Sequence, residues 1–347
     1  MLGYVKHGRG AGAAALGQVP VPEPGPGQAL VRVAACGICG SDLHAVRADP
    51  GYEWVEPPVV LGHEFTGTVV AAGPGVAGLG LGDPVVAVSI QGCGRCATCR
   101  SGATQLCPER RIAGLHHDGG LAEYAVVGAR HLVAVPAGLD LVEAALTEPL
   151  SVAVHAVGDR AGIQPGDRVV VSGPGTIGLL CGRLALLAGA DVMALGTRSD
   201  AAERLPLAAR LGLDAVEVDG RGAEDAVRAR FGVGGPDRWI EASGAIPALE
   251  AAVRTTRRGG TVTVVAMFAR PLTMQVTDAV RSELTIACSY ASAPAHYQAA
   301  LGHLADGSVD AAALLHRFGL GETPAAFAAA TRAAVVKPLI LPDPPGQ

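Results

Sequence analysis

Aromatic residues, runs of like charge and long uninterrupted apolar stretches are scarce in this sequence. Phe, Trp and Tyr make up 3% of its 347 residues, and the formal net charge is −5. A protein that binds nucleic acid needs a basic face for the phosphates, so the charge argues against that class of partner. The apolar fraction of 49% excludes a disordered chain, which would combine low hydrophobicity with high net charge.

No segment is typical of a membrane span or a signal peptide. The longest apolar stretch, around residues 177–195, is interrupted by Arg183 and Asp191. The segment before Pro20 has no continuous apolar core, which makes it a poor signal peptide. We therefore expect a cytoplasmic protein without a membrane partner. In that reducing compartment the eight cysteines are expected to be metal ligands or buried small hydrophobes rather than disulfides.

The length predicts two domains, and the sequence pattern changes near Glu148. Before it, short apolar runs at 30–33, 66–71 and 85–90 are separated by Gly and Pro, which predicts a β-rich, partly closed module. After it, strand-like and helix-like segments alternate, which predicts a parallel sheet with helices on both faces. The predicted strands are 168–172, 192–195, 215–218, 238–241 and 261–265, and the helices 176–188, 201–211 and 248–254. A helix at 295–304, a closing strand at 335–341 and a mobile tail at 342–347 complete the prediction.

Four cysteines lie close together in the segment GCGRCATCRSGATQLC. Cys93, Cys96 and Cys99 are each separated by two residues, and Cys107 follows after a short loop. Four thiolates complete a tetrahedron around zinc and leave no open position, so the pattern predicts a structural zinc lobe at about 92–108. A redox pair needs only two cysteines, and an iron–sulfur cluster is the weaker alternative.

A second set of metal-ligand types is spread over CGICGSDLH, GHEF and TEPLSVAVHAV. It comprises Cys39, His44, His63, Glu64 and Glu148. A catalytic zinc needs three protein ligands and one position left open for water or substrate. A cysteine, a histidine and a carboxylate of this set meet that need.

Taken with DGGLAEY and GPGTIG, these segments resemble the zinc-dependent medium-chain dehydrogenase/reductase family, in the branch of sorbitol, threonine and other polyol dehydrogenases. The resemblance runs from about Val19 to about Ile340, and the motifs occur in the family's order. It implies an α/β protein with a GroES-like β-rich catalytic domain at 1–149 and 291–347. A Rossmann cofactor domain is expected at 150–290, and the chain is expected to form a homodimer or homotetramer.

The resemblance implies that Cys39 and His63 are ligands of the catalytic zinc. The third ligand is Glu148 or Glu64, and we favour Glu148. Asp42 is expected to accept the free N–H of His63 and so orient it, although it also suits a helix cap or turn. Cys36, Cys181 and Cys288 have no such role and are expected in the core.

Ser41 and His44 match the residues that carry the substrate proton outward in relatives. Hydride transfer requires that the hydroxyl proton has left, and zinc promotes this loss. Ser41 is expected to accept the proton, and His44 to pass it on through the cofactor ribose. A turn serine and a surface histidine are the alternatives. His116 and Trp54 are candidates for a polar substrate pocket, although solvent exposure or packing explains them equally well.

The segment Gly173-Pro-Gly175-Thr176-Ile177-Gly178 follows a predicted strand and opens a helix, which is the context of a dinucleotide site. Gly173 permits the turn, Gly175 lets the pyrophosphate approach, and Gly178 allows helix and strand to pack closely. The helix N-terminus then offers free N–H groups to the phosphates. Lys337 matches a basic residue that meets the pyrophosphate in relatives, and an exposed surface lysine is the alternative.

The end of the second Rossmann strand predicts the choice between NAD and NADP. The family places an acid there in NAD enzymes, and this position is Thr197, followed by Arg198 and Ser199. Arg198 is suited to a 2′-phosphate, and the two hydroxyls add donors. Asp200 is too far along and is expected to cap the next helix. We therefore expect NADP(H), with adenine stacking on Arg198 and dual cofactor use as the alternative.

The sequence thus predicts a zinc enzyme that transfers hydride between NADP(H) and a secondary hydroxyl of a polyol, sugar, cyclitol or amino-alcohol. The alternatives are an NAD-dependent alcohol dehydrogenase, an aldehyde or ketone reductase, and, more remotely, a non-catalytic dinucleotide-binding protein. The last of these predicts the loss of at least one of Cys39, His63, Ser41 and His44, and all four are present.

Overall fold

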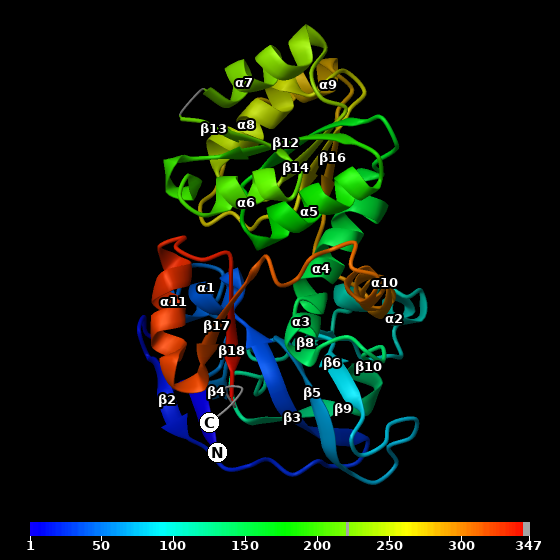
Figure 1. Ribbon diagram of the computed structural model, residues 1–347, viewed down its shortest axis with the longest axis vertical. Helices are drawn as coiled ribbons and strands as arrows, with labels where there is room; N and C mark the ends of the chain where they lie inside the picture. Colours follow the sequence, from blue (N-terminus) through cyan, green and yellow to red (C-terminus); the bar gives the residue numbers. More distant parts are fainter. Residues whose placement is uncertain (220–221, 343–347) are drawn as a thin grey trace. The chain divides into compact units, whose positions relative to one another are not determined.

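The computed structural model describes residues 1–219 and 222–342, and the chain divides into two units (Figure 1). The β unit comprises Met1–Ser151 and Ser292–Gln347, and the α/β unit comprises Val152–Ala291. The predicted domains change at 149/150 and 290/291, within two residues of these divisions. The predicted mobile tail at 342–347 lies, apart from Pro342, outside the described residues.

The β unit is built on a seven-stranded sheet with the order β10-β6-β5-β3-β18-β17, and β9 also pairs with β3. Its central strand β3 (Gln28–Gly37) alternates outward residues with the buried Ala29, Val31 and Val33, the period of two that a half-buried strand requires. A three-stranded sheet β2-β1-β4 and the pair β7-β8 complete the unit. The other strands are β1 (Leu2–Lys6), β2 (Ala14–Gln18), β4 (Val59–Val60), β5 (Glu64–Ala72), β6 (Pro84–Ala87), β7 (Ile90–Gln91), β8 (Arg111–Ile112), β9 (Tyr124–Gly128), β10 (Leu132–Ala134) and β17 (Leu315–Gly319).

The chain returns to the β unit after the α/β unit. Strand β18 (Lys337–Leu341) pairs antiparallel with β3, Ile340 opposite Cys36. This pairing places Lys337 beside Ile38, which comes 299 positions earlier in the sequence. The helices of the unit are α1 (Gly40–Arg47), α2 (Ala97–Arg100), α3 (Leu141–Ala144), α10 (Pro294–Ala305) and α11 (Thr323–Thr331). Helix α4 (Thr147–Val154) carries the chain onward, and a π-helical stretch, His155–Ala161, follows it.

The α/β unit contains a six-stranded parallel sheet with the order β13-β12-β11-β14-β15-β16. In chain order this is 3-2-1-4-5-6, the arrangement of dinucleotide-binding folds, so the predicted Rossmann sheet is confirmed. The strands are β11 (Arg168–Ser172), β12 (Asp191–Gly196), β13 (Asp214–Glu217), β14 (Arg238–Glu241), β15 (Thr261–Val264) and β16 (Thr285–Cys288).

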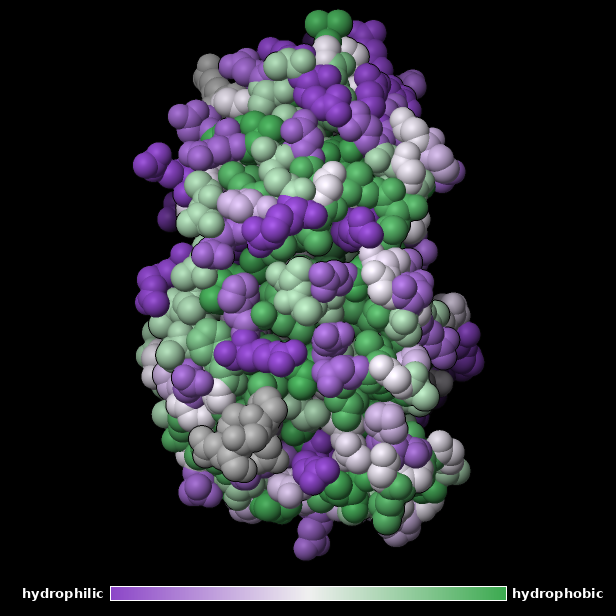
Figure 2. Space-filling view, in the orientation of Figure 1, coloured by the Kyte–Doolittle hydropathy of each residue, from purple (hydrophilic) through white to green (hydrophobic). Residues whose placement is uncertain are grey.

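Helices cover both faces of this sheet (Figure 1): α5 (Thr176–Leu187) and α6 (Arg204–Arg210) on one, and α7 (Gly222–Phe231), α8 (Ile246–Thr255) and α9 (Val276–Arg281) on the other. Hydrophilic residues cover much of the end that carries α7 in the view of Figure 2. Trp239 on β14 is fully buried, and its Nε1 donates to Ser172 Oγ at 2.9 Å, which satisfies the one polar atom of the ring. In the described part of the chain no helix is both long and apolar enough to cross a membrane.

The three cysteines outside the two metal-ligand sets differ in their burial. Cys36 and Cys181 are fully buried, as predicted. Cys288 is exposed, so its prediction as a core residue is wrong. The reason is that β16 is the last strand of its sheet, and Thr285, Ile286 and Cys288 all lie exposed along it.

Candidate active site and metal centres

Three of the predicted residues come together where the turn between β3 and α1 meets the start of β5. Cys39 is the N-cap of α1, and its backbone N–H donates to Asp42 Oδ2 at 2.9 Å. Glu64 is the first residue of β5 and is directly opposite Gly37 of β3, and His63 immediately precedes the strand. Gly62 has φ of +93°, and a Cβ there would come within 2.7 Å of Cys36 Sγ. The backbone before His63 therefore requires glycine.

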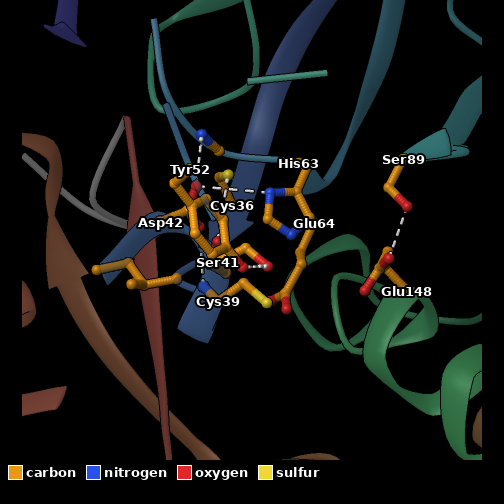
Figure 3. Close-up of polar contacts among 12 residues, drawn as sticks. Cys36, Cys39, Ser41, Asp42, Tyr52, His63, Glu64, Ser89 and Glu148 are labelled. Carbon is orange, nitrogen blue, oxygen red and sulfur yellow. Dashed lines mark hydrogen bonds and ion pairs between the residues drawn. The ribbon is translucent and has the colours of Figure 1, made fainter. Parts of the chain in front are cut away.

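Cys39, His63 and Glu64 offer ligand atoms that all lie within 4.8 Å of one another (Figure 3). His63 is buried, and its Nδ1 lies 3.5 Å from the fully buried Asp42 Oδ1. Burial disfavours a charged His63, but the negative charges of Asp42 and Cys39 outweigh burial and raise its pKa well above the usual value. A thiolate, an imidazole and a carboxylate in this arrangement form a donor set suited to zinc with one position open.

Asp42 caps the first turn of α1, one of its two predicted roles, whereas its expected hydrogen bond from His63 is not formed: Nδ1 stays at 3.5 Å without a hydrogen-bond partner among the described residues. Asp42 closes the first turn of α1 on Cys39, and its other oxygen accepts the N–H of Gly62 at 3.3 Å beside His63. The segments that carry Cys39 and His63 are thus held by one buried carboxylate.

Lys337 is buried and bound to Glu64. Its Nζ lies 2.6 and 2.8 Å from the two carboxylate oxygens of Glu64 and 3.1 Å from Ile38 O. Burial lowers the pKa of Lys337, but the Glu64 carboxylate outweighs that effect and raises it. The interpretation of Lys337 as an exposed surface lysine is wrong, because β18 runs through the interior of the β unit.

Glu148, the favoured third ligand, is not part of the group formed by Cys39, His63 and Glu64. Its Oε1 accepts a hydrogen bond from the hydroxyl of Ser89 at 2.7 Å (Figure 3). Ser89 Oγ in turn accepts from the OH of the buried Tyr297 at 3.1 Å. Burial and then the charge of Glu64 raise the pKa of Glu148. The structure therefore brings Glu64, rather than Glu148, to Cys39 and His63.

The predicted relay residues both lie on α1. The hydroxyl of Tyr52 donates to Ser41 Oγ at 3.3 Å, and the ring of Tyr52 stacks on His44 with centroids 5.2 Å apart. The candidate pocket residues Trp54 and His116 stack on each other at 4.4 Å, and Trp54 stacks on Tyr52 at 5.9 Å. Sequence reasoning did not predict this row of four rings, because nothing in the spacing places residue 116 beside residue 54.

The four cysteines form the second convergent group, with ligand atoms within 4.8 Å of one another. Cys96 Sγ and Cys107 Sγ lie 3.8 Å apart, the edge of a tetrahedron of sulfurs placed at about 2.3 Å from zinc. Backbone N–H groups of Arg95 and Cys96 lower the pKa of Cys93 to about 6, whereas burial raises that of Cys99 to about 12. A bound cation would remove this difference, because thiolates are the ligating form.

The glycine-rich segment lies between β11 and α5, where a dinucleotide site was predicted. Gly173 has φ of +88°, and a Cβ on Gly178 would lie 2.0 Å from Gly173 O. A Cβ on Gly175 would meet no atom within 4 Å, which leaves open space at the start of α5. Thr176 and Ile177 open this helix, and its N-cap, Gly175, has no side chain to occupy the free N–H groups.

The end of β12 presents no free carboxylate. Strand β12 ends at Gly196, and Thr197 follows with its hydroxyl 2.8 Å from that of Ser199, while Arg198 is exposed. Asp200 is buried and turns back to accept the N–H of Thr197 at 2.9 Å. It therefore caps the short 3-10 turn Arg198–Asp200, not the next helix as predicted, because α6 begins only at Arg204.

Comparison with known proteins identifies both units. The alcohol dehydrogenase GroES-like domain matches residues 25–137, and the zinc-binding dehydrogenase domain matches residues 176–306. The chain is 34% identical to the sorbitol dehydrogenase of Halalkalibacterium halodurans over 319 residues, which cover 91% of this chain and 92% of that protein.

Two solved structures are similar over nearly the whole chain. A zinc-binding dehydrogenase of Sinorhizobium meliloti, bound to NADP, has a TM-score of 0.88 and 34% identity, covering 98% of this chain and 99% of that one. An alcohol dehydrogenase of Escherichia coli CFT073, in complex with NADH, has a TM-score of 0.89 and 26% identity, with coverage of 98% and 99%. The predicted combination of a GroES-like and a Rossmann domain is confirmed.

Proposed function

Since this chain belongs to the zinc-dependent medium-chain alcohol dehydrogenases, in the polyol dehydrogenase-like branch, we propose that it oxidises a secondary hydroxyl of a sugar, cyclitol, polyol or amino-alcohol with NADP as hydride acceptor. The observation that carries the proposal is the convergence of Cys39, His63 and Glu64, with Ser41 on α1 drawn next to Cys39 in Figure 3. The sorbitol dehydrogenase relative supports a hydroxyl-rich small molecule as the substrate.

Cys39, His63 and Glu64 would hold the catalytic zinc, with Glu148 as the carboxylate that could replace Glu64. When bound, zinc supplies a Lewis acid that favours the alkoxide form of the substrate hydroxyl. Asp42 fixes His63 from behind, and Lys337 keeps the Glu64 carboxylate in place through its two short contacts. Cys93, Cys96, Cys99 and Cys107 would hold a second, structural zinc.

Ser41 and His44 would remove the substrate proton. Ser41 Oγ already accepts a hydrogen bond from Tyr52, so its own proton is directed elsewhere and can be exchanged with the substrate. His44, one helical turn further on, would take up the proton that leaves Ser41 and release it to water. Ser41 and His44 therefore move a proton, whereas Cys39, His63 and Glu64 bind and orient.

NADP is preferred to NAD because of the residues after β12. The carboxylate of Asp200 is occupied by Thr197 and Arg204, so it does not face a 2′-phosphate. Arg198 is exposed beside the hydroxyls of Thr197 and Ser199. Charge-assisted hydrogen bonds from a guanidinium are the strongest contact available to a phosphate at this place.

The test follows reduced nicotinamide by its absorbance, with NADP and NAD run in parallel against sugars, cyclitols, polyols, amino-alcohols and simple alcohols. We expect reduction of NADP with one hydroxyl-rich class. The variant Arg198→Gln should raise the KM for NADP by about 10-fold or more and leave the KM for NAD nearly unchanged, since it removes a charged contact to the phosphate alone.

Equal use of NAD by the unchanged protein would refute the NADP assignment and keep the zinc mechanism. Reduction of aldehydes or ketones without measurable alcohol oxidation would favour the reductase alternative. No turnover with any substrate, in protein shown to contain zinc, would contradict the proposed activity.

A further inference from the structure

His44 has a carboxylate partner that the proposed relay does not yet use. Helix α1 ends at Arg47, and Ala48 then adopts a left-handed conformation with φ of 54°. This turn directs the chain back along the helix, and the N–H of Asp49 donates to His44 O at 3.1 Å. As a result the Asp49 carboxylate lies beside the imidazole, with Oδ2 2.7 Å from His44 Nδ1.

That distance fixes the position of one proton. An ionised carboxylate only accepts hydrogen bonds, and the hydrogen bond from His44, helped by Arg47, lowers the pKa of Asp49. At 2.7 Å the hydrogen must therefore lie on Nδ1. Arg47 Nη2 lies 3.2 Å from the same nitrogen, but a protonated Nδ1 has no lone pair to accept a hydrogen bond from it. Arg47 instead donates to Asp49 Oδ2 through Nε at 3.0 Å. A neutral imidazole so held keeps its lone pair on Nε2.

The same turn also fixes the plane of the ring. The N–H of Tyr52 donates to Asp49 O at 3.2 Å, and the Tyr52 ring stacks on His44 with 23° between the planes. The hydroxyl of Tyr52 reaches Ser41. The segment from Asp49 to Tyr52 therefore contacts both residues of the relay. Asp49 binds Nδ1 of His44, and Tyr52 stacks on the His44 ring and donates a hydrogen bond to Ser41 Oγ.

We propose that Asp49 is a positioning residue of the proton relay: it holds His44 in the Nδ1–H form, so that Nε2 is the atom that takes the proton. This inference rests on the proposed function, in which the proton leaves the substrate hydroxyl through Ser41 and His44. When the proton reaches Nε2, the ring carries both protons and one positive charge, which Asp49 stabilises across the existing hydrogen bond. Loss of the Nε2 proton to water restores the starting form.

The first test reads the tautomer directly and needs no turnover. In protein labelled with ¹⁵N-histidine, the His44 signals are identified by their loss in His44→Gln. We expect a protonated Nδ1 and an unprotonated Nε2 in the unchanged protein and in Asp49→Glu, and a shift toward the Nε2–H form in Asp49→Ala. An Nε2–H form in the unchanged protein, or no change in Asp49→Ala, would overturn the inference.

The second test is kinetic and separates this inference from the proposed relay. Asp49→Ala should lower kcat for alcohol oxidation by about 10- to 100-fold with little change in KM, and Asp49→Glu should retain more activity than Asp49→Ala. In a His44→Gln background, Asp49→Ala should have no further effect. The matched control is Asp191→Asn, which removes an exposed carboxylate paired with Arg230.

The outcomes of this second test are distinct. Slow turnover in His44→Gln and Ser41→Ala with normal turnover in Asp49→Ala would keep the relay and overturn the role of Asp49. Normal turnover in both His44→Gln and Ser41→Ala would refute the relay itself, and with it the inference. A loss in Asp49→Ala that persists at full size in the His44→Gln background would show that Asp49 acts elsewhere.

Discussion

The two carboxylates predicted as third zinc ligand, Glu64 and Glu148, have different hydrogen-bond partners. Glu64 is bound through both oxygens by the buried ammonium of Lys337, whereas Glu148 is held by the neutral hydroxyl of Ser89. One Glu64 oxygen is still able to turn to a metal ion while the other keeps Lys337 paired, so no buried charge is left alone. Glu64 therefore combines the right position with a stable charge balance.

The two carboxylates are expected to differ in their effect on metal binding. Glu64→Gln should reduce the zinc that remains at the catalytic site, because it removes a ligand and also leaves Lys337 without its counter-charge. Glu148→Gln keeps the hydrogen bond to Ser89 and should retain that zinc. Metal analysis after dialysis checks both variants, with thermal unfolding to confirm that each is folded. The reverse result would restore Glu148 as the resting ligand.

At the scale of elements, the sequence predicted the strands of the α/β unit more accurately than its helices. The prediction for 238–241 coincides with β14, and that for 261–265 is one residue longer than β15. Helix α7 was not predicted because charged residues dominate it. Its buried residues, Ala223, Val227 and Phe231, do recur every four positions, so the signal was present but short.

The start of β11 depends on an ion pair that gives a prediction about pH. Asp237 accepts from Arg168 Nε at 3.0 Å and from Arg257 Nε at 2.5 Å. Although burial opposes its charge, these hydrogen bonds lower the pKa of Asp237 to about 2, from an ordinary value of 3.8. A depressed carboxyl pKa contributes stability that is present above about pH 4 and is lost as the pH falls toward 2.

Asp237→Asn should therefore lower the free energy of unfolding of the α/β unit by about 1 to 2 kcal/mol at pH 7, after allowance for screening by solvent, and by clearly less at pH 2.5, close to the lowered pKa. Urea unfolding followed by fluorescence in a Trp54→Phe background reports on Trp239, which lies in this unit. Asp191→Asn, at a more exposed ion pair, should change little at either pH. An equal loss at both values would show that the carboxylate's charge is not the cause.

For the whole molecule, sequence motifs predicted two metal-ligand groups, but they did not decide whether Glu64 or Glu148 lies beside Cys39 and His63. Spacing alone predicted the four-cysteine group because its residues lie within 15 positions of one another. The group of Cys39, His63 and Glu64 depends on the pairing of β3 with β5, and the burial of Lys337 depends on a strand from the far end of the chain. Such long-range pairings leave no local signal. A homodimeric or homotetrameric assembly stays a prediction.

The two groups predict two zinc ions per chain that respond differently to removal. The four-cysteine group is closed by four thiolates, whereas the other has three protein ligands and an open position. A mild chelator should therefore remove the catalytic zinc first, which abolishes activity without unfolding the protein, and added zinc should restore activity.

Cys107→Ser should leave one zinc per chain and, if about 3 kcal/mol of unfolding free energy is lost, lower Tm by about 6 to 12 °C. Cys288→Ser, the matched control at an exposed cysteine outside both groups, should keep two zinc ions and an unchanged Tm. Two zinc ions in Cys107→Ser, or one in the unchanged protein, would contradict the assignment of the four cysteines as a separate structural site.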